Sequence, residues 1–417
     1  MNVKVNHQKV SIILIGIQFL AFFIGIFWIN QDKFPFRVLG DVKLYYDYSF
    51  NLMNGKLPYR DFSVEYPPLA LVPMVLPQVI NFCKSLFGLV PNIRDYTRLF
   101  WLENALFSTY AALILAKIAM INQLRYRYKQ VLITYALMVL IAIPLLPWRY
   151  DLFPSLLTLL SFYSLLLNQP IIAGMFLGSG ILAKLYPVIL MPIFFLYWFV
   201  QQNYKACYQF CLSTISFISI ISLPFLLISP ENYLSFLTYH KQRGLQIETL
   251  PASLILLAEK LGLIKNQESL IQYNYGAFHV ALPLADFIAK ILPILFLLLF
   301  IIGIIKAKIS FQKNYHSTGQ ISIQILSRYV VIVLLIFILC NKVFSPQYII
   351  WLLPFIPLLK LTETMIWCLI CILTIIIYPF NYQLLSSMDY VMILLLNLRN
   401  FLFAFLTFRL MKRDIIT

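Results

Sequence analysis

The chain has 417 residues, of which 61% are hydrophobic and 12% charged, and its formal net charge is +16. Soluble domains carry about 25% charged residues, and uninterrupted apolar runs close to 20 residues long are stable only in a bilayer, so the composition excludes an ordinary soluble protein. The basic residues lie between the apolar runs, where they set topology and meet anionic headgroups, so we expect membrane lipids and no nucleic acid as partners.

The apolar runs predict an all-α polytopic membrane protein, with one membrane-embedded domain over residues 1–417. The first run follows two lysines, is too long for a signal peptide and lacks a small-residue cleavage site, so we expect it to be a retained span. We place about twelve spans at 10–29, 98–120, 131–147, 152–167, 171–183, 187–200, 207–228, 281–305, 329–341, 348–360, 364–380 and 390–410.

This span order gives a definite topology. With the N-terminus inside, most short inside loops carry lysine or arginine, as the positive-inside rule requires. We therefore predict a multi-pass protein of the plasma (inner) membrane, with both termini inside. The two long loops, 30–97 and 229–280, then lie outside together with most of the acidic residues.

Two apolar stretches need a special interpretation. Residues 66–84 contain four prolines, so we expect a juxtamembrane segment on the outer surface and not a span. The run 171–200 is too long for one span and has Lys184 near its middle, where a lysine would cost roughly 3 kcal/mol on insertion scales. Two short helices joined at an outer turn remove that cost.

The first outer loop contains the densest group of polar residues. Residues 42–54 have helical character and end at Asn54-Gly55, a favourable C-cap. Asp41 stands just before this helix, where it could be an N-cap or a general base at the membrane boundary. The two roles are compatible, since a capped carboxylate is also a preorganised one.

Two helix breaks carry cations. Arg149 could form a local pair with Asp151 in a tight outer turn, or it could bind phosphate with Asp151 orienting it. Lys184 precedes Tyr186-Pro187 and could extend to the headgroups, or it could place a point charge on the phosphate of a lipid carrier.

Two later loops also allow both a structural and a functional interpretation. The stretch with His240, Arg243, Gln246 and Glu248 is either a solvated loop or a contact surface for a sugar and its phosphate. Residues 341–348 either mark a helix boundary or line a cavity as irregular backbone.

Several motifs are absent. The chain has no phosphate-binding G-x-x-x-x-G-K-[ST], no H-E-x-x-H, no G-x-G-x-x-G and no G-x-S-x-G. Nucleotide-driven transport, zinc proteolysis and serine hydrolysis therefore lack local support. The six cysteines lie in or at the ends of apolar runs with no accompanying histidine, so we expect packing roles, no metal site and no cofactor.

The order of these short motifs resembles that of the GT-C superfamily of membrane glycosyltransferases. It resembles more narrowly glycosyltransferase family 87, the polyprenyl-phosphate-mannose-dependent mannosyltransferases. The matching residues span positions 40 to 348: Asp41, Tyr45, Gly55, Pro58, Tyr59, Tyr66, Pro67, Pro68, Leu69, Lys184, Tyr186, Pro187, Arg243, Gly244, Leu245, Gln246, Glu248, Phe344, Ser345, Pro346, Gln347 and Tyr348.

The resemblance implies a bundle of about twelve spans with juxtamembrane helices in the first outer loop. It also implies inverting transfer of a hexose, with mannose expected, from a polyprenyl-phosphate-linked sugar donor to a hydroxyl of a glycan, lipid or polyol acceptor. Asp41 would be the catalytic base. Donor-phosphate candidates are Lys184, Tyr186, Arg149, Arg243 and Lys342, and sugar or acceptor candidates are Tyr45, Tyr59, Glu65, Tyr66, His240, Gln246, Glu248, Gln347 and Tyr348.

Two other classes stay open: a transporter or flippase for a lipid-linked or anionic solute, and an assembly subunit of a polysaccharide machine. Repeat symmetry and charges at the membrane midplane would favour the transporter. No internal repeat is visible, and the Asp and Lys candidates lie on the predicted outer side. Both observations favour the transferase.

Overall fold

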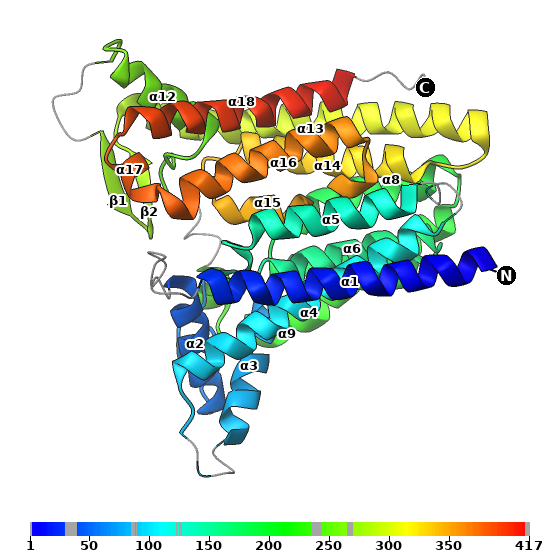
Figure 1. Ribbon diagram of the computed structural model, residues 1–417, viewed down its shortest axis with the longest axis horizontal. Coiled ribbons are helices and arrows are strands. Elements are labelled where there is room, and N and C mark those ends of the chain that lie inside the picture. The colour runs from blue at the N-terminus through cyan, green and yellow to red at the C-terminus, as the bar shows by residue number, and fades with distance from the viewer. Residues whose placement is uncertain are drawn as a thin grey trace. The chain divides into compact units, whose positions relative to one another are not determined.

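The computed structural model describes residues 2–29, 40–84, 88, 90–121, 124, 127–235, 243–264 and 270–412, and these are mostly helical (Figure 1). The chain divides into two compact units, Met1–Tyr239 and His240–Thr417. The prediction of one domain over residues 1–417 remains a prediction.

The first unit contains long apolar helices and several short ones at their breaks. In chain order they are α1 (Asn2–Ile29), α2 (Gly40–Met53), η1 (Pro68–Ala70), α3 (Leu71–Cys83), α4 (Ile93–Ala119), α5 (Tyr128–Ala142), η4 (Leu146–Trp148), α6 (Leu152–Leu166), α7 (Pro170–Ala183), η5 (Tyr186–Leu190), α8 (Met191–Val200), α9 (Tyr204–Ile228) and α10 (Pro230–Tyr233).

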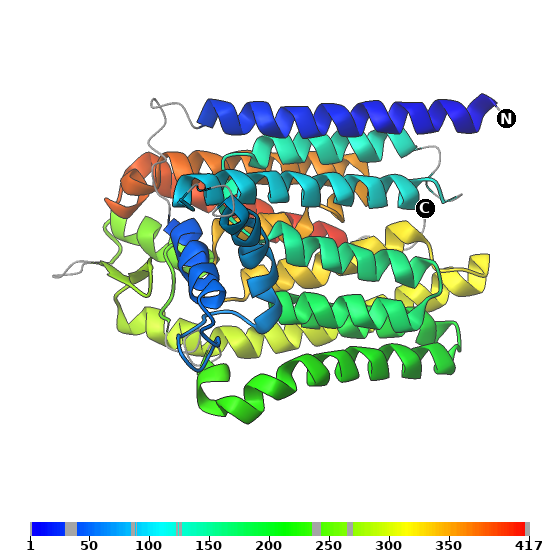
Figure 2. The same cartoon turned by 90° about the horizontal axis from the view of Figure 1, so that it is seen from below.

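The predicted juxtamembrane segments are helices that cross the bundle direction. Figure 1 shows α2 and α3 running steeply to α1, whereas α1 packs along α4 and α5 (Figure 2). The α2 helix ends at the predicted C-cap, where Gly55 has a φ of 77° and donates its N–H to the Leu52 carbonyl. Asp41, by contrast, lies inside the first turn of α2 and not before it, so the N-cap prediction is wrong.

Helices α7 and α9 pack through small residues. A Cβ on Gly174 would lie 2.6 Å from the Phe210 carbonyl oxygen, and one on Gly178 would lie 3.1 Å from the Thr214 carbonyl oxygen. These glycines are four residues apart on one face of α7, the spacing that lets two membrane helices approach closely.

The second unit contains α12 (Leu250–Lys260), β1 (Ile271–Asn274), β2 (Ala277–Val280), α13 (Pro283–Thr318), α14 (Ile323–Leu339), η6 (Pro346–Tyr348), α15 (Ile349–Leu352), η7 (Ile356–Leu358), α16 (Leu361–Ile375), η8 (Ile376–Phe380, kinked at Tyr378 before a cis proline), α17 (Tyr382–Ser386) and α18 (Tyr390–Lys412). A buried apolar cluster joins the segment before α12 to the hairpin, α13, α17 and α18, and includes Leu245, Leu256, Val280, Leu385 and Leu396.

Strands β1 and β2 form an antiparallel hairpin that the sequence did not lead us to expect. Its two turn residues, Tyr275 and Gly276, have φ values of 49° and 70°, which matches the handedness of a tight hairpin turn. An isolated antiparallel bridge between Gln246 and His279 pairs the segment before α12 with the free edge of β2.

Five helices among the described residues are long and apolar enough to cross a membrane: Ile93–Ala119, Tyr204–Ile228, Pro283–Thr318, Leu361–Phe380 and Tyr390–Lys412. Shorter apolar helices lie at most other predicted spans, so a helical membrane protein is supported, while the number twelve remains a prediction. The span predicted at 348–360 is not one continuous helix. Pro354 and Pro357 divide it into short helical turns, and its residues from Ile349 to Leu359 are buried.

Candidate functional site

Three charged side chains of the first unit lie at breaks between helices. Arg149 follows η4 in an extended conformation, and Asp151 directly precedes α6. Lys184 is also extended, between the end of α7 and η5. Prolines at 144, 147 and 187 interrupt the helices around these positions, so the cations lie on irregular backbone and not on a helix face.

The first pair joins the predicted base to a cation. Arg149 donates from Nη1 to Oδ2 of Asp41. The Asp41 side chain is 35% exposed and that of Arg149 is 12% exposed, so the carboxylate is the part of this pair that solvent reaches. The Asp41 carboxylate is therefore both held in place and partly accessible to solvent.

The second pair is more deeply buried. Lys184 donates from Nζ to Oδ1 of Asp151 at 2.6 Å, and the Asp151 side chain is fully buried. The same ammonium lies 5.0 Å from the centre of the Tyr150 ring. Burial lowers the pKa of Lys184, the nearby Arg149 charge lowers it further, and Asp151 opposes this shift.

Tyrosine rings pack beside these charges. Tyr45 and Tyr66 each meet the Tyr150 ring edge to face, with centroids 5.6 and 5.2 Å away. The Tyr150 hydroxyl donates to the Ala183 carbonyl at 3.3 Å, next to Lys184. The sequence-predicted Tyr45, Tyr66, Arg149 and Lys184 therefore belong to one cluster.

The other predicted residues of this unit have mainly supporting positions. The Tyr59 hydroxyl donates to the Tyr66 carbonyl at 2.6 Å, which fixes the loop that carries Tyr66. Tyr186 is buried, and its hydroxyl lies 3.4 Å from that of Thr158. The backbone N–H of Glu65 donates to the Tyr48 hydroxyl at 3.4 Å.

In the second unit, Glu248 belongs to a buried polar network and not to a solvated loop. Gln246 donates from Nε2 to its carboxylate at 3.2 Å, and Nη1 of Arg399 lies 3.7 Å from the carboxylate. Asn400 donates to the Glu248 carbonyl at 3.3 Å. The Arg399 side chain is completely buried and lies over the Phe344 ring, 4.1 Å from its centre.

Three basic side chains of the second unit, Arg243, His279 and Lys342, interact electrostatically. The Gln246 N–H donates to the Lys342 carbonyl, and Gly244 packs against the His279 ring. Burial, then the Arg243 and Lys342 charges, lower the pKa of His279 to about 4. Burial and Arg243 also lower the pKa of Lys342. The backbone thus brings the predicted Arg243 and Lys342 together with a histidine that the prediction omitted.

Gln347 and Tyr348 occupy the broken segment after α14. The Ser345 hydroxyl donates to the Gln347 side-chain oxygen. Tyr348 stacks on Trp351 with ring centroids 4.0 Å apart and also on Phe344. His240 lies outside the described residues.

Sequence reasoning missed Arg399, Asn400 and His279. An arginine within the apolar run 390–410 was itself a signal, because charges inside a span are rare and are usually paired. In the described part of the chain, no three His, Cys, Asp or Glu side chains are grouped to hold a metal ion.

The fold therefore defines a helical membrane protein with a charged, tyrosine-lined cluster in its first unit. Comparisons with protein-family models, with curated proteins and with solved structures gave no match.

Proposed function

We propose that the protein is an inverting glycosyltransferase of the GT-C type, resembling family 87, that works at the outer face of the plasma membrane. It would move a hexose, with mannose expected, from a polyprenyl-phosphate donor to a hydroxyl of a glycan, lipid or polyol. The observation that carries the proposal is the cluster in which accessible Asp41 lies with Arg149 and Lys184.

The chemistry needs a base for the acceptor and positive charge for the leaving phosphate. Asp41 would take the acceptor proton as the acceptor oxygen bonds to the anomeric carbon. The bond from that carbon to the phosphate oxygen breaks on the opposite face, and its electron pair leaves with the polyprenyl phosphate. Arg149 and Lys184 would stabilise the charge on that phosphate.

The two ion pairs suggest how donor binding could prepare the base. The Arg149 guanidinium occupies one oxygen of the Asp41 carboxylate. A donor phosphate would compete with Asp41 for this guanidinium. Drawing Arg149 toward the phosphate would free the carboxylate to accept the acceptor proton, which limits proton abstraction to the loaded site.

The test is transfer by the purified protein from labelled polyprenyl-phosphate sugars to several acceptors. Asp41→Asn should lower the rate by at least 100-fold, within the range typical of a lost general base. Asp47→Asn is the matched control, because Asp47 is an exposed carboxylate on the same helix, and it should leave the rate within about two-fold.

Full-rate transfer by Asp41→Asn would reject Asp41 as the base. If the unmodified protein transferred no sugar from any donor to any acceptor, the transporter or flippase alternative would be favoured.

A further inference from the structure

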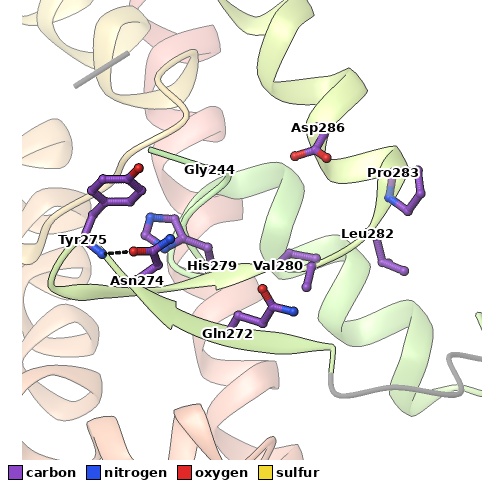
Figure 3. Close-up of a pocket in the computed structure, with 10 residues that line it drawn as sticks. Gly244, Gln272, Asn274, Tyr275, His279, Val280, Leu282, Pro283 and Asp286 are labelled. Carbon is purple, nitrogen blue, oxygen red and sulfur yellow. Dashed lines mark hydrogen bonds between the residues drawn. The ribbon is translucent and has the colours of Figure 1, made fainter. Parts of the chain in front are cut away.

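The hairpin and the start of α13 line an open pocket of about 410 Å³ within the second unit. Polar side chains that line it include Gln272, Asn274, His279 and Asp286 (Figure 3). Its volume lies within the range of small-molecule sites in proteins, which is about 300–1,000 Å³.

The strand register explains why the polar groups meet. Gln272 pairs directly with His279, so their side chains emerge on the same face of the hairpin. Asn274, two residues after Gln272, shares that face, and its Oδ1 accepts from the Tyr275 N–H at 2.8 Å. Asp286 faces the same space from the first turn of α13. The pocket is therefore built on regular backbone.

His279 is the buried polar group of this pocket. The residue is 6% exposed, and no described residue meets normal hydrogen-bond geometry at either ring nitrogen, although the Ala277 backbone acts on the ring and raises its pKa. The neutral imidazole offers one donor and one acceptor, so the ring can bind a group that both accepts and donates. A buried ring of this kind in a pocket favours a polar ligand.

The lining favours a neutral ligand rich in hydroxyl groups. A hydroxyl both donates and accepts, which matches the two amides, the imidazole and the carboxylate. Among the described lining residues none is a lysine or arginine, and the Asp286 carboxylate opposes the positive charge of Arg243 and Lys342, which act on His279 from outside the lining. Leu282 and Pro283 supply apolar surface for the C–H groups of a ring.

We propose that this hairpin pocket binds the sugar or polyol end of a neutral, hydroxyl-rich molecule. The binding itself depends only on the pocket.

The test uses the full-length protein in nanodiscs, with methyl α-mannoside and myo-inositol as probes and saturation-transfer NMR as the readout. Both probes should bind at millimolar concentration, and His279→Leu and Asp286→Asn should each weaken binding at least five-fold. Asp286 is exposed, so Asp286→Asn tests the pocket even if His279→Leu fails to fold. His316→Leu is the matched control, because His316 is exposed at the far end of α13, and it should leave binding within about two-fold.

Absence of binding, or binding unchanged by Asp286→Asn, would overturn the proposal. So would tighter binding of inositol phosphate than of inositol, since that would define an anion site.

The binding test is separate from the transferase proposal. Probe binding that Asp286→Asn weakens, in a protein that transfers no sugar, would support the pocket and reject the transferase. Transfer by a protein that binds neither probe would reject the pocket and leave the transferase intact.

Discussion

Asp41 and Asp151 each pair with a cation, but solvent reaches only the first of these carboxylates. Asp151 is fully buried, so its pairing with Lys184 holds the end of α7 against the start of α6. Asp41 is 35% exposed and can meet a substrate hydroxyl. The difference in burial fits a structural role for Asp151 and the proposed base role for Asp41.

The buried pair predicts a large stability effect. Asp151→Asn removes the charge that compensates Lys184, and breaking a buried pair typically costs about 3–5 kcal/mol. We expect a clearly lower thermal unfolding midpoint for Asp151→Asn in detergent. The double variant Asp151→Leu with Lys184→Met, which removes both charges, should recover much of that loss.

The control is Asp61→Asn, which breaks the exposed pair with Arg60 and should change the midpoint little. An Asp151→Asn protein as stable as the parent would show that Asp151 does not hold Lys184.

His279 predicts a dependence of stability on pH. The pKa of its imidazole is about 4 in the fold, against an ordinary value of about 6.5, so the unfolded chain binds more protons between these values. Stability should therefore fall as the pH drops from about 6.5 toward 4. Burial lowers this pKa most, and the Arg243 and Lys342 charges lower it further, while the Ala277 backbone raises it. The Asp286 carboxylate lies in the same pocket.

The measurement is the unfolding midpoint as a function of pH. His279→Gln should flatten the slope in this window, whereas His316→Gln should retain it. An identical slope in the parent and His279→Gln would contradict the assignment.

At the scale of elements, the α7–α9 contact depends on the absence of side chains. The Gly174 and Phe210 backbones are too close for any Cβ to fit without a shift. Only 11% of the apolar part of helix α9 is buried within the protein. The contact with α7 therefore contributes much of the packing that holds α9 to the first unit.

Gly174→Leu should therefore separate the two helices and lower the unfolding midpoint by several degrees, because overpacking in a tight contact typically costs about 1–3 kcal/mol. Gly16→Leu is the matched control in another apolar helix, since nothing lies within 4 Å of a Cβ there. Equal midpoints for the two variants would refute the role of the contact.

Sequence periodicity predicts elements better than it predicts partners. The apolar runs locate most helices because their length and composition are local properties. The partner of Asp151 lies 33 residues away, and no local pattern specifies that pairing. The hairpin had a weak signal, since Tyr275-Gly276 follows a short alternating segment, but the prediction of one long loop over 229–280 did not include it. At 348–360 the apolar run suggested a span, and its prolines determined the broken structure.

At the scale of the whole molecule, charge distribution predicts sidedness. Helix α13 has 36 residues and would be about 54 Å long, longer than a hydrocarbon core of about 30 Å. Its basic second half, with Lys306, Lys308 and Lys313, should therefore emerge on the inside, and the hairpin at its other end should be outside.

Cysteine labelling tests this topology. In a background lacking exposed Cys83, cysteines replacing Lys43 and Tyr273 should react with an impermeant reagent added outside, and a cysteine replacing Lys308 should not. Opposite labelling of positions 43 and 273 would contradict the predicted topology.

The burial of Arg399 has a consequence for how the protein is made. On its own, α18 would enter the bilayer with an arginine near its middle, at a cost of about 3 kcal/mol. Its partner Glu248 belongs to a segment synthesised about 150 residues earlier, so their ion pair can form only after the last helix has been made. The buried polar network of the second unit is therefore complete only when the C-terminal helix is in place.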